Sequence, residues 1–233
     1  MSLLSTRGLS KSFSGLTAVD GVDFDLPQGE IRALIGPNGA GKTTFVSLLC
    51  GRIAPSAGRV MFDGADISAL PAHRRIALGM AYTFQITSVF ARLSVWENVA
   101  LAARRRMRRV ENPVRQALAQ VGLQDRAGQI AGDLAYGHQR LLEIAMGLVQ
   151  QPRLLILDEP TQGLADAEID SFKALIRGLK QHSTILLIEH NMDVVMETAD
   201  TVSVLNFGRI LAEGPPDAIR ADRAVQAAYL GTG

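Results

Sequence analysis

The segment Gly-Pro-Asn-Gly-Ala-Gly-Lys-Thr at residues 36–43 constrains the fold more than any other part of the chain. It fits the pattern G-x-x-x-x-G-K-[ST] at every position, and its glycines let the backbone curl so that successive N–H groups face one anion. The apolar run 31–35 precedes it, and a helical stretch from Lys42 to about Cys50 follows. This order predicts a strand, a phosphate-binding loop and a helix. A glycine-rich turn that binds nothing is the alternative, and the flanking elements argue against it.

Each residue type in this loop has a chemical task in nucleotide binding. Lys42 supplies a positive charge for the β- and γ-phosphates, and Thr43 offers a hydroxyl to Mg²⁺, a cation that prefers oxygen ligands. The helix that starts there adds its positive N-terminal end. The candidate nucleotide-binding residues of the loop are Gly36, Pro37, Asn38, Gly39, Ala40, Gly41, Lys42, Thr43 and Thr44.

A second apolar run ends in two acids. Residues 154–157 lie between Pro152 and Pro160 and are too few for a buried helix, so they predict a buried strand that leads into Asp158 and Glu159. In an open α/β sheet, ligands bind beyond the carboxyl ends of the strands, where these acids would emerge. We therefore expect Asp158 to hold Mg²⁺ and Glu159 to orient the attacking water. A simple cap of the turn before the proline is the alternative.

His190 follows another apolar run, residues 184–188, and is therefore expected at the same edge of the sheet. A histidine there can form a hydrogen bond to the γ-phosphate and to the attacking water. A surface histidine without a role is the alternative. Further on, residues 201–205 begin a terminal hairpin whose turn lies at residues 206–209.

The alternation of short apolar runs and helical stretches predicts an α/β protein with a mostly parallel sheet. Turn signals among the first thirty residues predict short antiparallel strands that flank this sheet. From about residue 90 to residue 147, helical stretches predominate, including 95–109 and 113–121. We therefore expect a helical insertion between the front and back halves of one sheet.

Composition excludes several other classes of protein. The 233 residues are 47% hydrophobic, which is enough for a sizeable core and excludes a disordered chain. The net charge is 24 − 23 = +1, so we expect no nucleic-acid partner. No apolar run approaches the roughly 18 residues that span a bilayer, and the first residues do not resemble a secretory signal. Cys50 is the only cysteine, so a reducing, cytoplasmic setting is expected.

Together these motifs resemble those of the nucleotide-binding subunits of ATP-binding cassette (ABC) transporters, over essentially the whole chain. The resemblance implies a P-loop NTPase (RecA-like) fold with a mostly parallel sheet core, an N-terminal antiparallel β subdomain and an inserted α-helical subdomain. The chain would be one ABC ATPase domain, 1–233. Its core subdomain would comprise about 1–88 and 148–233, and its helical signature subdomain about 89–147.

The resemblance also implies site residues. The family's glutamine between the two subdomains matches Gln85, which would contact Mg²⁺ and water and couple the site to the membrane subunit. The aromatic residue that stacks on adenine matches Phe13, with phenylalanine where tyrosine is commoner, and the histidine of the switch region matches His190. The expected catalytic residues are Lys42, Glu159 and His190. The expected metal ligands are Thr43, Gln85 and Asp158.

The family's signature, Leu-Ser-Gly-Gly-Gln, reaches the partner's ATP in the family's dimer and is altered here. The candidate nucleotide contacts at its positions are Leu134, Ala135, Tyr136, Gly137 and His138. Ala135 lacks the serine hydroxyl that would contact the γ-phosphate and cap a helix, a cap worth about 1 kcal/mol. Gly137 and the helix N-terminus remain. We therefore expect this chain's own site to hydrolyse ATP but a weaker signature for the partner, which favours a heterodimer with a second, homologous ATPase subunit over a homodimer.

Short segments at 142–145, 163–165, 189–192 and 228–231 resemble one branch of the family, which serves importers of branched-chain and other hydrophobic amino acids, with urea and short amides among its relatives. This implies ATP and Mg²⁺ as cofactors and transmembrane permease subunits as partners. A periplasmic or extracellular solute-binding protein would take part indirectly. The chain would lie peripherally on the cytoplasmic face of the inner (plasma) membrane.

Other functions remain open at this point. They are the ATPase subunit of a lipid or lipopolysaccharide exporter, an ABC ATPase that acts in translation or DNA repair, and a phosphate-loop kinase of small molecules. Five arginines within residues 104–109 indicate a solvated face of the helical insertion. The alternatives are a membrane-facing stripe that contacts anionic lipids and, although no aromatic residues are interleaved, nucleic-acid binding. Phe90 and Trp96 either pack in the core or contact the membrane subunit.

Overall fold

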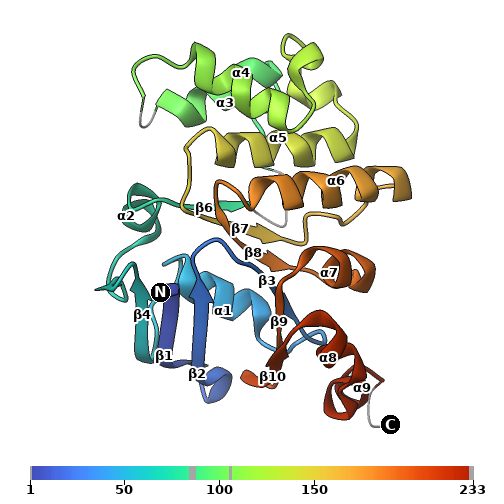
Figure 1. The fold of residues 1–233 in the computed structure, drawn as a ribbon. Helices are drawn as coiled ribbons and strands as arrows, with labels where there is room; N and C mark the ends of the chain where they lie inside the picture. Colours follow the sequence, from blue (N-terminus) through green and yellow to red (C-terminus); the bar gives the residue numbers. More distant parts are fainter. Residues whose placement is uncertain (1, 84–87, 105–106, 231–233) are drawn as a thin grey trace.

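The computed structural model describes residues 2–83, 88–104 and 107–230. Its larger sheet has six strands in the order β10-β9-β3-β8-β7-β6, of which only β10 is antiparallel to its neighbour (Figure 1). The strands are β3 (Ile31–Ile35), β6 (Met80–Thr83), β7 (Leu154–Asp158), β8 (Thr184–Ile188), β9 (Thr201–Asn206) and β10 (Arg209–Gly214). The predicted strands at 31–35, 154–157 and 184–188 and the terminal hairpin are therefore confirmed.

The smaller sheet is antiparallel, with the strand order β2-β1-β4-β5. Its strands are β1 (Ser2–Phe13), β2 (Leu16–Pro27), β4 (Ala57–Phe62) and β5 (Ala65–Asp66). The prediction of short strands near the N-terminus was wrong, because β1 and β2 each have 12 residues. Of the glycines that indicated turns, Gly15, with a φ of 94°, does lie in the turn between β1 and β2. Gly21, with a φ of 62°, lies inside β2 beside a shift in the β1–β2 register, where it bends the strand without ending it.

The helices form layers on both faces of the large sheet. They are α1 (Lys42–Leu49), α2 (Ala72–Ala77), α3 (Val95–Arg104), α4 (Glu111–Gln120), α5 (Tyr136–Leu148), α6 (Asp166–Leu179), α7 (Met192–Thr198), α8 (Pro216–Ala221) and α9 (Arg223–Leu230). Figure 1 shows α3 and α4 above α5, on the opposite side of the large sheet from the small sheet. None of the described helices combines the length and the apolar composition that crossing a membrane requires.

Strand β7 shows how the core divides. Leu154 and Ile156 belong to the apolar cluster shared with α1 and the small sheet. Leu155 and Leu157 belong to the cluster shared with the helical layer. Successive side chains of a strand point to opposite faces, so a short, wholly apolar run is buried on both sides. This burial holds the strand end, and with it the acids that follow, in a fixed place.

Two helix predictions needed correction. The helix expected at 95–109 ends at Arg104, and of the following residues 107–110 are described and are not helical. Like charges spaced four residues apart disfavour a longer helix there. The helix expected to start at Leu141, after the signature, already starts at Tyr136, so the signature forms its first turn.

Candidate nucleotide-binding site

The loop between β3 and α1 is tightly curled and packed on one side. A Cβ atom added at Gly36 would lie 2.1 Å from the backbone oxygen of Leu205, and one at Gly41 would lie 2.3 Å from that of Ala18. Gly39, with a φ of 78°, has open space around its Cα. No described side chain caps α1, and the first amides of a helix have no partners within it. The open side of the loop therefore presents N–H groups to an anion.

Lys42 lies over this loop at the start of α1. Its Nζ donates hydrogen bonds to the carbonyl oxygens of Gly36, at 2.6 Å, and Pro37, at 3.1 Å. Burial lowers the pKa of the Lys42 ammonium, and the nearby Glu159 and Asp158 carboxylates act against this lowering. The ammonium is thus held at the loop by carbonyl groups, and phosphate oxygens are stronger partners for it.

Asp158 ends β7 and is 4% exposed. Its Oδ2 accepts a hydrogen bond from the Tyr82 hydroxyl at 2.7 Å, which comes from the neighbouring strand β6. Burial raises the pKa of the Asp158 carboxyl, and the Tyr82 hydrogen bond lowers it in part. Burial and this hydrogen bond raise the pKa of Tyr82, which keeps its hydroxyl a donor. Sequence analysis missed Tyr82 because pairing between β6 and β7 is not visible in the chain order.

Glu159, half-buried, has a strained backbone next to Asp158. Its φ is 47°, in the left-handed region that costs a residue with a side chain about 1 kcal/mol or more. Two backbone hydrogen bonds hold it there. Its N–H donates to the carbonyl oxygen of Ile188 at 2.9 Å, and its carbonyl oxygen accepts from the N–H of Gln162 at 3.2 Å. The first bond joins the ends of β7 and β8, so Glu159 lies at the carboxyl edge of the sheet.

A third acid, Glu189, lies at the same edge and is 1% exposed. Its Oε1 accepts from the N–H of Thr161 at 3.0 Å and from the Thr161 hydroxyl at 2.6 Å. Its Oε2 accepts from the N–H groups of His190, at 3.0 Å, and Asn191, at 3.2 Å. Sequence analysis missed Glu189, although it follows a buried strand just as the acids after β7 do. That shared position was the signal that could have found it.

His190 itself is exposed at the end of β8, at the carboxyl edge where it was expected. Phe13, at the end of β1, is 46% exposed, and the Nζ of Lys11 lies 5.1 Å from the centre of its ring. An exposed ring at a hairpin offers a face on which a flat base can stack. Gln85 lies outside the described residues, so its role stays a prediction.

The signature residues 134–138 lie at the start of α5, on the helical side of the large sheet (Figure 1). Ala135 is the N-cap residue and makes no side-chain hydrogen bond to the helix. A Cβ added at Gly137 would lie 2.6 Å from Oε1 of Glu168, so a larger residue here would have to displace the Glu168 side chain at the contact between α5 and α6. The structure thus places this segment against α6, while the loop 36–43 lies on β3 and α1.

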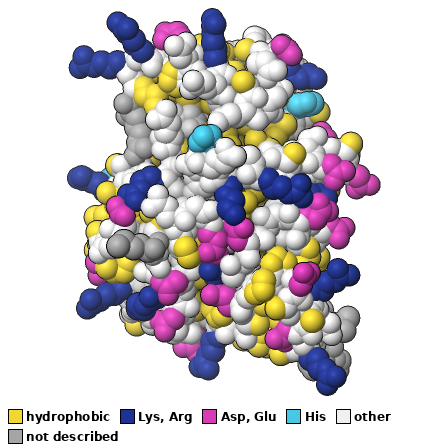
Figure 2. All heavy atoms as spheres, viewed as in Figure 1, with side chains coloured by type: hydrophobic (Ala, Val, Ile, Leu, Met, Phe, Trp, Pro, Cys, Tyr) yellow, Lys and Arg dark blue, Asp and Glu magenta, His cyan; other side chains and the backbone are white. Residues whose placement is uncertain are grey.

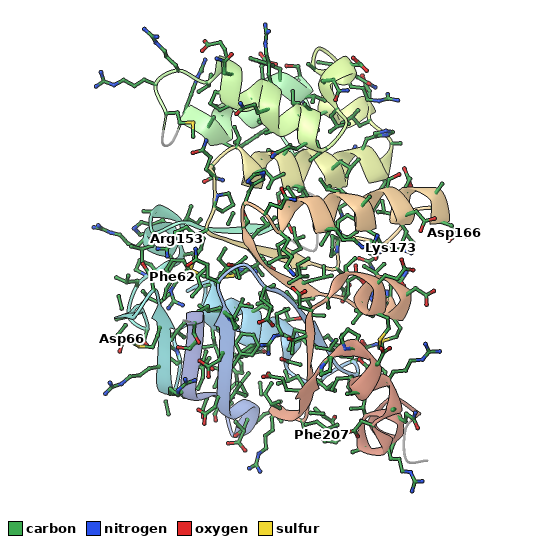
Figure 3. All side chains as sticks on the ribbon, viewed as in Figure 1. Phe62, Asp66, Arg153, Asp166, Lys173 and Phe207 are labelled. Carbon is green, nitrogen blue, oxygen red and sulfur yellow. The ribbon has the colours of Figure 1, made fainter. Side chains whose placement is uncertain are left out.

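The turn between β9 and β10 forms a backbone hydrogen bond with the phosphate loop. Gly208 donates a backbone hydrogen bond to Ala40 at 2.9 Å and accepts one from the N–H of Asp20 at 2.9 Å. Its neighbour Phe207 is 86% exposed and projects at this turn (Figure 3). The hairpin that the sequence predicted therefore joins the small sheet to the loop.

The oxygen donors at this edge fit Mg²⁺. Among the described residues, no group of three or more His, Cys, Asp or Glu side chains could hold a metal ion alone. The Thr43 hydroxyl and the Asp158 carboxylate are hard oxygen donors, and Mg²⁺ commonly uses one or two protein oxygens together with phosphate oxygens. The donor set fits a cation that binds together with a nucleotide. With the loop and the edge acids, it defines a phosphate-loop nucleotide-binding protein.

Comparison with known proteins assigns this class to a family. The family model described as "ABC transporter" matches residues 19–162, and the model described as "Branched-chain amino acid ATP-binding cassette transporter" matches residues 209–233. The chain therefore belongs to the ABC transporter family. It is an ATPase subunit of that family, and its nucleotide is ATP.

Several relatives match along nearly the whole chain. The chain is 40% identical to the high-affinity branched-chain amino acid transport ATP-binding protein BraF of Pseudomonas aeruginosa and 39% identical to LivG of Escherichia coli K12, each over 98% of both chains. It is 31% identical to the lipopolysaccharide export system ATP-binding protein LptB of Haemophilus influenzae, over 99% of this chain and 98% of that one. The crystal structure of a nucleotide-free ATP-binding cassette from an ABC transporter superposes with a TM-score of 0.91, at 26% identity, and covers 99% of this chain and 100% of that one.

These findings confirm the expected P-loop NTPase fold and ATPase class. As a member of this family, the chain functions with transmembrane permease subunits, as one of a pair of ATPase subunits, at a membrane.

Proposed function

We propose that the chain powers an importer of branched-chain or other hydrophobic amino acids or related small amides. The observation that carries this proposal is the match of residues 209–233 to the branched-chain amino acid family, together with the near full-length similarity to BraF. In this role the chain lies peripherally on the cytoplasmic face of the inner membrane. A solute-binding protein outside that membrane delivers the cargo to the permease.

ATP binds with its phosphates in the loop 36–43 and its adenine on Phe13. Lys42 neutralises the β- and γ-phosphates, and Thr43, Gln85 and Asp158 hold Mg²⁺, which supplies charge neutralisation on the phosphates when bound. Glu159 orients the attacking water, and His190 contacts the γ-phosphate. Phosphoryl transfer needs little covalent chemistry from the protein, so these side chains act by position and charge. The placement of these groups, Phe13 and Gln85 aside, around β3, β7 and β8 supports the assignment.

The permease contacts the helical subdomain, about residues 89–147, which moves relative to the core at about 1–88 and 148–233. A hollow of about 250 Å³ on α3 supports this proposal because apolar and charged side chains share it. It is lined by Leu93, Trp96, Glu97, Ala100, Leu101 and Arg104. Trp96 also packs against the helical cluster, and Phe90 is 55% exposed, so the two aromatics differ in their surroundings.

The second ATPase subunit is a homologous but different chain. Ala135 caps α5 without a side-chain hydrogen bond, which supports a weakened signature. In the assembly, that second subunit supplies an intact signature for the ATP bound to Lys42 and Glu159. Residues 134–138 of this chain complete the partner's weaker site.

An exporter subunit is a second candidate function, favoured by the 31% identity to LptB over nearly the whole chain. A transport assay separates the two. The chain, the second ATPase subunit and the candidate permease are reconstituted in vesicles with the solute-binding protein on the opposite side, and uptake of labelled leucine is measured with ATP on the side of the ATPase subunits. We expect uptake that is lost with Lys42→Ala. Lipid movement without leucine uptake would instead support the exporter.

A further inference from the structure

Glu189 is a buried carboxylate to which the hydrolysis scheme gives no part. A carboxylate at 1% exposure needs compensation for the lost hydration. Here four hydrogen bonds from N–H and O–H donors provide it, and in the described part of the chain the residue has no salt-bridge partner. Removing the carboxylate would leave these donors without their acceptor, so Glu189 and the two segments that it binds depend on one another.

The four donors come from two different loops. Oε1 binds Thr161, which lies two residues after Glu159 in the loop that follows β7. Oε2 binds the backbone of His190 and Asn191 in the loop that follows β8. The carboxylate therefore joins the loop of one catalytic candidate to the loop of the other.

The backbone at Glu159 makes such a link consequential. A left-handed φ of 47° persists in a residue with a side chain only where surrounding contacts hold it. The hydrogen bond to Ile188 holds the residue from one side. The Thr161 anchor holds the same loop from the other side, across Pro160. Without that anchor, the loop can relax and the Glu159 carboxylate can leave its position.

We infer that Glu189 is a positioning residue that keeps Glu159 and His190 in register during ATP hydrolysis. This inference rests on the catalytic roles proposed above for those two residues. It predicts that weakening the link lowers kcat, because the groups that act in the transition state are displaced, while the phosphate loop still binds ATP.

The first test removes one hydroxyl. Thr161→Val deletes the 2.6 Å hydrogen bond to Glu189 at nearly constant volume, and Thr161→Ser restores a hydroxyl. Phosphate release is measured in the ATPase-active assembly over a range of ATP concentrations. We expect Thr161→Val to lower kcat by about 10- to 100-fold, with KM changed less than about twofold, and Thr161→Ser to recover most of the loss.

Thr198→Val is the matched control. Thr198 is also buried, and its hydroxyl also donates a 2.6 Å hydrogen bond, but to Val194 within α7. Losing that bond affects stability without touching either loop, so kcat should stay within about twofold. Equal losses of kcat in Thr161→Val and Thr198→Val would assign the effect to general destabilisation and overturn the inference.

Glu189→Gln provides a second route to the same test. The amide can accept at its oxygen, but its NH₂ then faces two N–H or O–H donors in one of the loops. We expect a larger loss of kcat than for Thr161→Val. If this variant does not fold, the comparison of Thr161→Val with Thr161→Ser still tests the inference.

A double-mutant cycle shows whether the link acts through Glu159. If it does, Thr161→Val lowers kcat much less in a Glu159→Gln background than in the wild type. The inference would be contradicted if the fold-losses of kcat in the two single variants multiply to give that of the double variant. It would also be contradicted if the kcat of Thr161→Val stays within about twofold of wild type. If instead the proposed catalytic roles of Glu159 and His190 are wrong, the result differs, because Glu159→Gln and His190→Ala then retain wild-type turnover.

Discussion

Asp158 shows at the scale of single residues how function and stability conflict in this site. Its carboxylate is buried, and the described contact to it is the hydroxyl of Tyr82. Burial raises its pKa above the ordinary value of 3.8. The folded state therefore binds this proton more tightly than the unfolded state does. Above the raised pKa, the ionised carboxylate opposes folding of the nucleotide-free protein.

The variant Asp158→Asn should therefore stabilise the nucleotide-free protein near neutral pH, by about 1 kcal/mol. Its side-chain oxygen can still accept from Tyr82. The gain should shrink as the pH falls through the raised pKa and vanish below the unfolded value of 3.8, because the wild-type carboxyl is then protonated in both states. Urea unfolding as a function of pH measures this. A loss of stability at neutral pH would contradict it, and Mg²⁺-dependent ATP binding should weaken in either case.

Local sequence was enough to predict some of these residues and not others. The loop lysine, Asp158 and Glu159 are recognisable because each motif is continuous in the chain. Tyr82 and Glu189 act through contacts between neighbouring strands, and which strands pair is decided by the packing of the whole sheet. The alteration at Ala135 was visible in the sequence, and its lack of a cap is a direct consequence of the side chain.

At the scale of elements, the phosphate loop lies at the start of α1, and a buried arginine from α2 contacts the end of α1. Arg75, in α2, is 1% exposed. Its Nη1 donates to the carbonyl oxygens of Leu48 and Leu49, at 2.7 and 2.8 Å, and two other guanidinium nitrogens donate to Leu70 and Ser68. The last carbonyls of a helix have no partners within it, so this guanidinium closes the end of α1. The sequence did not predict this role, since α2 carries two adjacent arginines.

The variant Arg75→Ala should lower the free energy of unfolding by about 3 kcal/mol, because it leaves several buried carbonyls without donors. Arg74→Ala is the matched control, since Arg74 is exposed on the same helix, and should change it by less than about 0.5 kcal/mol. Urea unfolding followed by circular dichroism measures both. Equal stability of the two variants would contradict the role of Arg75 at the end of α1.

The elements near the catalytic loops are tied to one another as well. Lys173 in α6 forms ion pairs with Asp170 and with Glu197 in α7, both at 2.9 Å, and its position along α6 is marked in Figure 3. Glu143 in α5 accepts hydrogen bonds from Arg140 and from the backbone of Ser88, which follows the segment that contains Gln85. The signature helix is thereby joined to Ser88. The length of α3, which ends at Arg104, was overestimated because arginine alone is a good helix former.

At the scale of the whole molecule, the face in Figure 2 carries Lys, Arg, Asp and Glu side chains over both the helical layer and the sheets. Figure 2 shows Lys and Arg side chains that project around the helical layer at the top of the view. Arg104, Arg108 and Arg109 are exposed, which agrees with a solvated face of this layer. The α/β class with a mostly parallel sheet followed from the sequence because the apolar runs are short, continuous and separated by clear turn signals, whereas the P-loop NTPase fold followed from the resemblance of the motifs to a known family.

The heterodimer proposal makes a prediction at this scale. Glu159→Gln, which slows hydrolysis, should stay monomeric in Mg-ATP during size-exclusion chromatography and form a dimer only with a homologous second subunit. The weakened signature of this chain is the reason, since two copies would pair it with both ATP molecules. A double variant that also carries Lys42→Ala is the control that cannot bind ATP. A stable homodimer of Glu159→Gln alone would contradict the proposal.

The central claim is that the acids after β7 act on ATP held in the loop 36–43. Phosphate release and ATP binding by the wild type and by Glu159→Gln, measured side by side in the ATPase-active assembly, test it most directly. We predict that Glu159→Gln binds ATP as the wild type does and hydrolyses it at least about 100-fold more slowly. Wild-type turnover in Glu159→Gln, with ATP bound equally well, would contradict this account of the site.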